Sequence, residues 1–181
     1  MSCHVIQLNP ENCCGCGACE QICPVGAIRL RPDSEGFPHP EVNLESCNKC
    51  DACRSACPAV AENRKRITSV PCKIYAGRSK NVKLVMQSTS GALFSELAMR
   101  ILEMNGVIYG CAWKRGVLQA EHIRVAAEEE LERLRQSKYV QSATGSTYRA
   151  IRKDLTNGIQ VLYSGTPCQI AGLKLFLRKE Y

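Results

Sequence analysis

Two stretches of sequence share one cysteine pattern. Residues 13–24 read Cys-Cys-Gly-Cys-Gly-Ala-Cys-Glu-Gln-Ile-Cys-Pro, and residues 47–58 read Cys-Asn-Lys-Cys-Asp-Ala-Cys-Arg-Ser-Ala-Cys-Pro. The repeated cysteines are Cys13, Cys16, Cys19 and Cys23, followed 34 residues later by Cys47, Cys50, Cys53 and Cys57. Proline follows the last cysteine of each stretch, at Pro24 and Pro58. A repeat that keeps cysteines and proline in register indicates two copies of one small structural unit.

The 13 cysteines among 181 residues form either disulfides or metal ligands. The first residues have no basic segment followed by an apolar one, and no stretch approaches the roughly 20 apolar residues that span a bilayer. We therefore expect a cytoplasmic protein without a membrane span. Because the cytosol keeps thiols reduced, dense cysteines there are metal ligands or catalytic groups.

The spacing predicts two 4Fe-4S clusters. Thiolates at i, i+3 and i+6 wrap one cube, and in two-cluster ferredoxins the cysteine before proline binds the other cluster. The predicted ligands are Cys13, Cys16, Cys19 and Cys57 for the first cluster, and Cys47, Cys50, Cys53 and Cys23 for the second. The alternative is zinc, but zinc sites pair two C-x-x-C knuckles, and a third cysteine at the same step has no purpose there.

The other cysteines and the histidines do not follow the repeat. Cys14 is out of register and is expected to pack beside the cluster. Cys3 and Cys72 have no partner at ligand spacing, so a small buried side chain is the default. A further site formed by Cys72, Cys111 and Cys168 stays open. The isolated histidines, expected to be surface or satisfied side chains, are His4, His39 and His122.

The formal charge of +7 counts every thiol as neutral. Four thiolates on an oxidised cluster core carry about two negative charges, so two clusters lower the total to about +3. The one basic run, Arg64-Lys65-Arg66, is typical of a solvated linker. We therefore expect no nucleic-acid partner.

Beyond Cys57 the cysteine density falls and the pattern alternates. The predicted domains are a two-cluster ferredoxin-type domain over 1–62, a linker over 63–75 and an α/β domain over 76–181. The predicted fold class is α+β: a small ferredoxin-like domain with two clusters, followed by a partial α/β domain. The periodicity predicts helices over 90–105, 127–136, 147–156 and 168–179, and strands over 107–113, 117–125 and 159–163.

Residues 161–173 contain a strand, a glycine turn and a helix start, whose free amides suit an anion such as a flavin phosphate. A structural turn without a ligand is the alternative. Cys168 is expected to have a lowered pKa at this helix start. The candidate cofactor-binding residues are Ser164, Gly165, Thr166, Pro167, Cys168 and Gln169.

Three segments, 88–94, 137–142 and 164–173, resemble the beta subunit family of coenzyme F-420 hydrogenases and dehydrogenases. A two-cluster ferredoxin start ahead of that domain is also similar to bacterial members. The resemblance implies an iron–sulfur flavoprotein in which FAD passes electrons between the clusters and a deazaflavin or another two-electron acceptor. Relatives continue well past the position of Tyr181, so the chain resembles a truncated member.

We therefore expect an oxidoreductase subunit that relays electrons from a redox partner protein, either a ferredoxin-like donor or a companion subunit, through two clusters to a flavin and a small-molecule acceptor. No particular catalytic side chain is predicted, because the cofactors carry the chemistry. The alternative is a ferredoxin-like electron carrier or binding module without catalytic activity of its own.

Overall fold

The computed structural model describes residues 3, 5, 8–60, 62–63 and 73–178. The chain contains both helices and strands and forms two compact units. The first unit combines residues 1–70 with residues 166–181, and the second contains residues 71–165. Most of the predicted linker, 63–75, lies outside the described residues.

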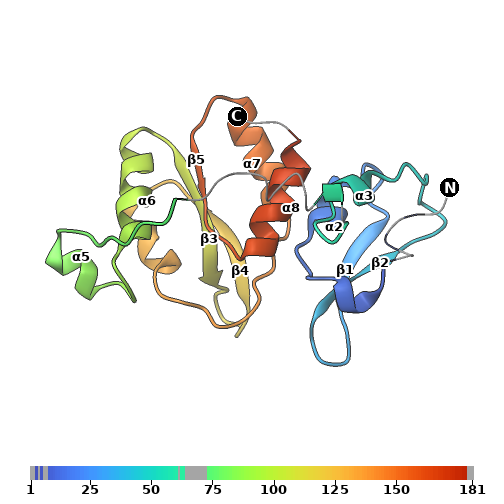
Figure 1. Cartoon of the computed structure of the whole chain (residues 1–181), viewed down its shortest axis with the longest axis horizontal. Coiled ribbons are helices and arrows are strands. Elements are labelled where there is room, and N and C mark those ends of the chain that lie inside the picture. The colour runs from blue at the N-terminus through green and yellow to red at the C-terminus, as the bar shows by residue number, and fades with distance from the viewer. Residues whose placement is uncertain (1–2, 4, 6–7, 61, 64–72, 179–181) are drawn as a thin grey trace. The chain divides into compact units, whose positions relative to one another are not determined.

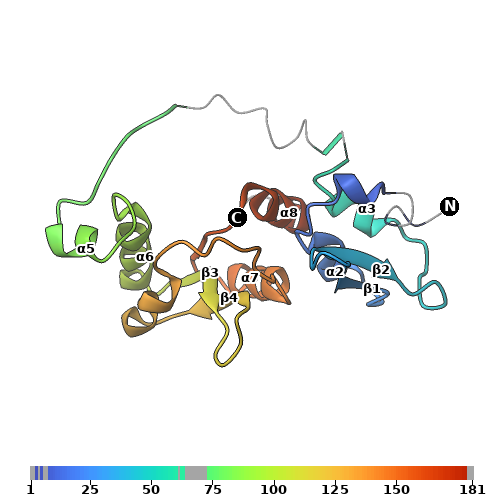
Figure 2. The ribbon, with the colours of Figure 1, turned by 90° about the horizontal axis from the view of Figure 1, so that it is seen from below.

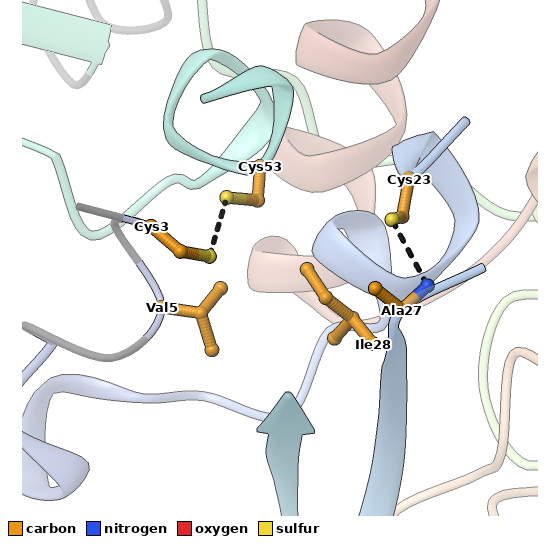
Figure 3. Close-up of a cluster of buried hydrophobic side chains, with 6 residues drawn as sticks. All are labelled: Cys3, Val5, Cys23, Ala27, Ile28 and Cys53. Carbon is orange, nitrogen blue, oxygen red and sulfur yellow. Dashed lines mark hydrogen bonds between the residues drawn. The ribbon is translucent and has the colours of Figure 1, made fainter. Parts of the chain in front are cut away.

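The first unit repeats one local structure. The short helices α2 (Ala18–Ile22) and α3 (Ala52–Ala56) each follow a cysteine loop and end at the cysteine that precedes proline. Between them, β1 (Ile28–Pro32) and β2 (Pro38–Val42) form an antiparallel hairpin, and the 3-10 helix η1 (Pro10–Asn12) precedes the first loop. Figure 3 shows the buried side chains that surround the hairpin's start.

Helix α8 (Pro167–Leu177) belongs to the first unit, although it is distant in sequence. It packs on α2 and α3, as Figures 1 and 2 show. Thr166 and Gln169 form a capping box at its start, and Pro167 occupies its first turn. A β-carbon on Gly172 would lie 3.1 Å from Cys16 Sγ, so only glycine allows the helix to approach this closely. The sequence places this segment in the α/β domain predicted over 76–181, whereas the structure groups it with the first unit.

The second unit contains a three-stranded sheet in the order β4–β3–β5. Strand β3 (Val107–Trp113) pairs antiparallel with β4 (Ala120–Val125) and parallel with β5 (Val161–Tyr163). Helices α6 (Leu93–Glu103) and α7 (Thr147–Thr156) lie on opposite faces of this sheet (Figure 1), and α5 (Val82–Met86) precedes α6. The core between α6 and the sheet includes Ala98, Ile108, Ala112, Val125, Leu131 and Leu134.

The strand predicted over 159–163 is the shorter β5, and the helix predicted over 168–179 is α8, which starts and ends earlier. Three further predicted elements differ from the structure. Helix α6 starts at Leu93 rather than after Ser90, because Ala92 takes a left-handed conformation with φ 61°. The second hairpin strand starts at Ala120, since Lys114 N bonds to Gln119 O and closes a longer loop. Residues 128–134 form the 3-10 helix η2 (Glu128–Leu134) rather than an α-helix. Its buried Leu131 and Leu134 are three residues apart, a spacing that a 3-10 helix aligns.

No helix among the described residues combines the length and the apolar character needed to cross a membrane.

Candidate functional site

The two cysteine loops share a backbone conformation as well as a sequence pattern. Gly15 and Gly17 have φ values of 60° and 77°, and Lys49 and Asp51, at the matching positions 34 residues later, have 56° and 57°. Backbone that alternates between right- and left-handed conformations turns successive N–H groups toward one side, and such concavities bind anions, including Fe–S groups. The loop geometry therefore fits a negatively charged cluster.

Each predicted ligand set lines its own cavity. One cavity is lined by Cys13, Cys16, Cys19 and Cys57, together with Cys14, Gly15 and Gly17. The other is lined by Cys23, Cys47, Cys50 and Cys53, together with Cys3. In the described part of the chain, no three or more His, Cys, Asp and Glu side chains are grouped so as to hold a single metal ion. A 4Fe-4S cube takes one thiolate at each of four iron corners, so its ligands surround a cavity.

In the first cavity, bare thiolates are disfavoured at the four proposed ligands. Burial raises the pKa of the Cys13 and Cys57 thiols. Burial also raises the pKa of Cys19, and repulsion from thiolates at Cys13 and Cys57 adds to the increase. The pKa of Cys16 is raised first by its hydrogen bond with Cys14 and then by burial. Four ligand thiolates here need a compensating cationic core, which iron supplies, so this donor set fits the cluster.

The second cavity contains further sulfur contacts (Figure 3). The backbone N–H of Ala27 donates to Cys23 Sγ at 3.3 Å. Cys3 Sγ lies 3.6 Å from Cys53 Sγ, and both side chains are buried. Cysteine spacing predicted no partner for Cys3, because a contact between residues 50 apart in sequence does not appear as a repeated cysteine interval.

The structure corrects the prediction for Cys168. Its Sγ lies 3.1 Å from Thr166 Oγ1 and 3.9 Å from the carbonyl oxygen of Cys14. Burial raises the pKa of this thiol, and a Cys14 thiolate raises it further, so the expected lowering at a helix start is wrong. Of the other two cysteines in the open site, Cys111 belongs to the second unit and Cys72 lies outside the described residues.

The described histidines have ordinary partners. His39 Nε2 lies 3.2 Å from Asp33 Oδ2. His122 is buried: its Nε2 lies 3.0 Å from the carbonyl oxygen of Ser164, its Nδ1 2.9 Å from Ser142 Oγ, and its ring stacks on Tyr163. Burial lowers the pKa of His122. His4 lies outside the described residues.

The second unit has a polar cavity of about 310 Å³ between the start of α6 and the end of η2. It is lined by Ser88, Thr89, Ser90, Ala92, Leu93, Phe94, Ser95, Gly110, Cys111, Leu134, Arg135, Gln136, Ser137, Lys138 and Ser164. The lining includes residues from each of the segments 88–94, 137–142 and 164–173. Sequence periodicity alone gave no indication of the cavity, because its walls are far apart along the chain.

Two side chains make this cavity suitable for an anion. Arg135 pairs with Glu132 at 2.6 Å, but its buried Nε has no hydrogen-bond partner among the described residues. Ser95 is 3% exposed and also lines the cavity. The backbone amides at the start of α6 add a partial positive charge. A buried donor without a partner is costly, so an acceptor from a ligand would stabilise Arg135.

Of the predicted cofactor-binding residues, Ser164 lines this cavity and Gly165 ends the second unit. Thr166, Pro167, Cys168 and Gln169 start α8 in the first unit. Gln169 is fully buried, and its Oε1 accepts from Thr166 N at 3.0 Å. The capping box therefore already occupies donors that a phosphate would need.

Comparisons with known proteins agree with the cysteine loops. Residues 6–61 match the family described as 4Fe-4S dicluster domain. The N-terminal part of the chain is a 4Fe-4S ferredoxin-type domain. A 29-residue stretch is 41% identical to an uncharacterized ferredoxin of Methanocaldococcus jannaschii, covering 16% of this chain and 47% of that protein. The chain thus spans about half the length of this curated relative.

Proposed function

We propose that the chain holds two 4Fe-4S clusters with crosswise ligands and works as an oxidoreductase subunit that passes electrons to a flavin. The first cluster is bound by Cys13, Cys16, Cys19 and Cys57, and the second by Cys47, Cys50, Cys53 and Cys23. The observation that carries the ligand assignment is that each set of four lines one cavity and includes one cysteine from the other repeat. When bound, the clusters supply reversible one-electron transfer.

The residues around the clusters bind and shield them. The amides of both loops would donate to the cluster sulfurs, and Ala27 N–H would stabilise the Cys23 thiolate. Pro24 and Pro58 turn the chain away after each fourth ligand because they cannot donate a backbone hydrogen bond. Gly172 lets α8 cover Cys16, which excludes water from the first cluster. This burial adjusts how readily the cluster is reduced.

The flavin is proposed to be FAD, held in the polar cavity of the second unit. Arg135 and the start of α6 would bind its phosphates, and Ser164, directly after β5, would contribute to the same site. The resemblance to the coenzyme F-420 hydrogenase and dehydrogenase beta subunit family supports this cofactor. It also makes a deazaflavin or another organic two-electron acceptor the substrate class. A redox partner protein, a donor or a companion subunit, exchanges electrons with the clusters.

Metal analysis of anaerobically purified protein tests the ligand sets. We expect about eight iron and eight sulfide per chain, with the absorption and EPR signals of 4Fe-4S clusters. Cys19→Ser and Cys53→Ser should each lose about half of the iron because each removes a ligand from one cluster. Cys14→Ser is the matched control and should keep all of it. Equal losses in Cys14→Ser would contradict the assignment.

Flavin release tests the second cofactor. Acid treatment of the same protein should liberate FAD, and Arg135→Gln should reduce the amount of FAD while the iron content stays unchanged. Arg133→Gln is the control, since Arg133 lies two residues before Arg135, in η2, and does not line the cavity. Full iron content without releasable flavin would contradict the flavin-dependent function and support the alternative one.

That alternative is a ferredoxin-like electron carrier or binding module without catalytic activity of its own. The match to a ferredoxin from Methanocaldococcus jannaschii favours it. Both functions need a redox partner protein, and only the first needs flavin, so the flavin content decides between them.

A further inference from the structure

Cys3 is a fifth thiol at the cavity of the second proposed cluster. Its side chain is 3% exposed, and its Sγ lies 3.6 Å from the Sγ of Cys53, which is 5% exposed. Figure 3 shows the two sulfurs facing each other within the buried group that also contains Val5 and Ile28. Cys3 also lines the cavity that contains all four proposed ligands of the second cluster.

Ligation fixes the direction of this contact. Between two free thiols, either sulfur can donate the hydrogen bond. A cysteine that binds iron does so as a thiolate and has no proton to give. If Cys53 is a ligand, the hydrogen bond therefore runs from the Cys3 S–H group to Cys53 Sγ. The distance falls within the range of sulfur hydrogen bonds, and the burial of both groups protects the bond from competition by water.

We propose that Cys3 is a positioning residue that donates a hydrogen bond to ligand Cys53 and thereby raises the reduction potential of the second cluster. This rests on the proposed ligand sets. Reduction adds negative charge to the cluster and its sulfurs, and a donor aimed at a sulfur stabilises the more negative state. Because both clusters have four cysteine ligands, their surroundings set the difference in reduction potential. Cys3 contributes to it from a chain segment outside both cysteine repeats.

Three substitutions separate the hydrogen bond from packing. Cys3→Ala removes the donor and leaves a smaller side chain, Cys3→Val removes the donor and puts a somewhat larger apolar side chain in its place, and Cys3→Ser keeps a donor. Iron and sulfide are counted first in each holoprotein. Potentiometric titrations followed by EPR then measure both cluster potentials. We expect unchanged iron content, a more negative potential for one cluster in Cys3→Ala and Cys3→Val, and a smaller shift in Cys3→Ser.

Cys111→Ala is the control, because Cys111 belongs to the other unit, and both of its cluster potentials should equal those of the wild type. Unchanged potentials in Cys3→Ala and Cys3→Val, at full iron content, would overturn the proposal. Loss of half the iron in both variants would also overturn it, since Cys3 would then be a ligand. Failure of the proposed function itself gives a different result, namely wild-type protein without 4Fe-4S signals.

Discussion

At the scale of single residues, a few residues make contacts that their chemical type does not suggest. Gly172 allows α8 to approach Cys16, and Ala27 donates its backbone N–H to Cys23 Sγ. His122 is surrounded by partners and kept neutral by burial. These roles depend on what lies opposite each residue in the fold, so the residue type alone gives little information about them.

Gly172→Val should undock α8. A β-carbon at this position would lie 3.1 Å from Cys16 Sγ and 3.2 Å from Ala18 Cβ, and the cluster proposed to bind Cys16 would leave that side chain little freedom to move. We expect a loss of about 2 kcal/mol, typical of overpacking, measured as a lower temperature of cluster bleaching in anaerobic thermal melts. Lys174→Val, at an exposed position of the same helix, should cost only the small helix propensity of valine. Equal effects in the two variants would contradict the packing role of Gly172.

His122 should make stability depend on pH. Burial lowers its pKa in the folded protein below the ordinary value of about 6.5, so the unfolded chain takes up its proton first. The contribution of neutral His122 to stability is therefore present above about pH 6.5 and is lost as the pH falls toward the lower folded-state pKa. Denaturant unfolding between pH 8 and pH 5.5 should show a smaller decline in His122→Gln than in the wild type. An equal decline in the free energy of unfolding of the wild type and of His122→Gln would show that His122 is not the cause.

At the scale of elements, the two cysteine loops adopt one backbone path with different residues. The first loop uses glycine at both left-handed positions, whereas the second uses Lys49 and Asp51. For residues with a β-carbon this conformation costs roughly 1–2 kcal/mol. The second loop is therefore the more strained copy.

Lys49→Gly should stabilise the protein. Glycine relieves the left-handed strain, but it also raises the conformational entropy of the unfolded chain. We expect the free energy of unfolding to increase by about 0.5–1 kcal/mol. Lys49 is exposed, so its side chain contributes little packing. Lys49→Ala is the control, because alanine removes the side chain but keeps the strain. The reciprocal change Gly15→Ala should destabilise the first loop by about 1 kcal/mol. The temperature of cluster bleaching measures all three, and a result in which Lys49→Ala matches Lys49→Gly would argue against strain.

At the scale of the whole molecule, two compact units share one chain that passes from the first to the second and returns. Because residues 166–181 group with the cysteine loops, the first unit contains both early and late sequence. The second unit contains the polar cavity proposed for flavin. Arg135 and Lys138, which line this cavity, contribute to the positive net charge of the chain, and the proposed clusters would lower that charge.

Cluster loss should make the protein more basic. The formal charge is +7 with neutral thiols, and two oxidised clusters with their thiolates reduce it to about +3. Native isoelectric focusing under anaerobic conditions should therefore place the holoprotein at a lower pH than the apoprotein obtained with a chelator. Reconstitution should restore the original position. An unchanged position after complete iron removal would contradict the charge assigned to the clusters.

The sequence by itself determined the ferredoxin-type domain, because ligation of a cluster requires cysteines at fixed steps, and that requirement is visible as spacing. It also located β3 and α7 at their observed bounds, since β3 is a short apolar run and α7 is followed by Asn157-Gly158. Only the tertiary structure decided that α8 packs on the cysteine loops, that Cys3 lies against Cys53, and that the cavity beside α6 exists. These features join residues far apart in sequence, and their contacts depend on three-dimensional packing, which has no period along the chain.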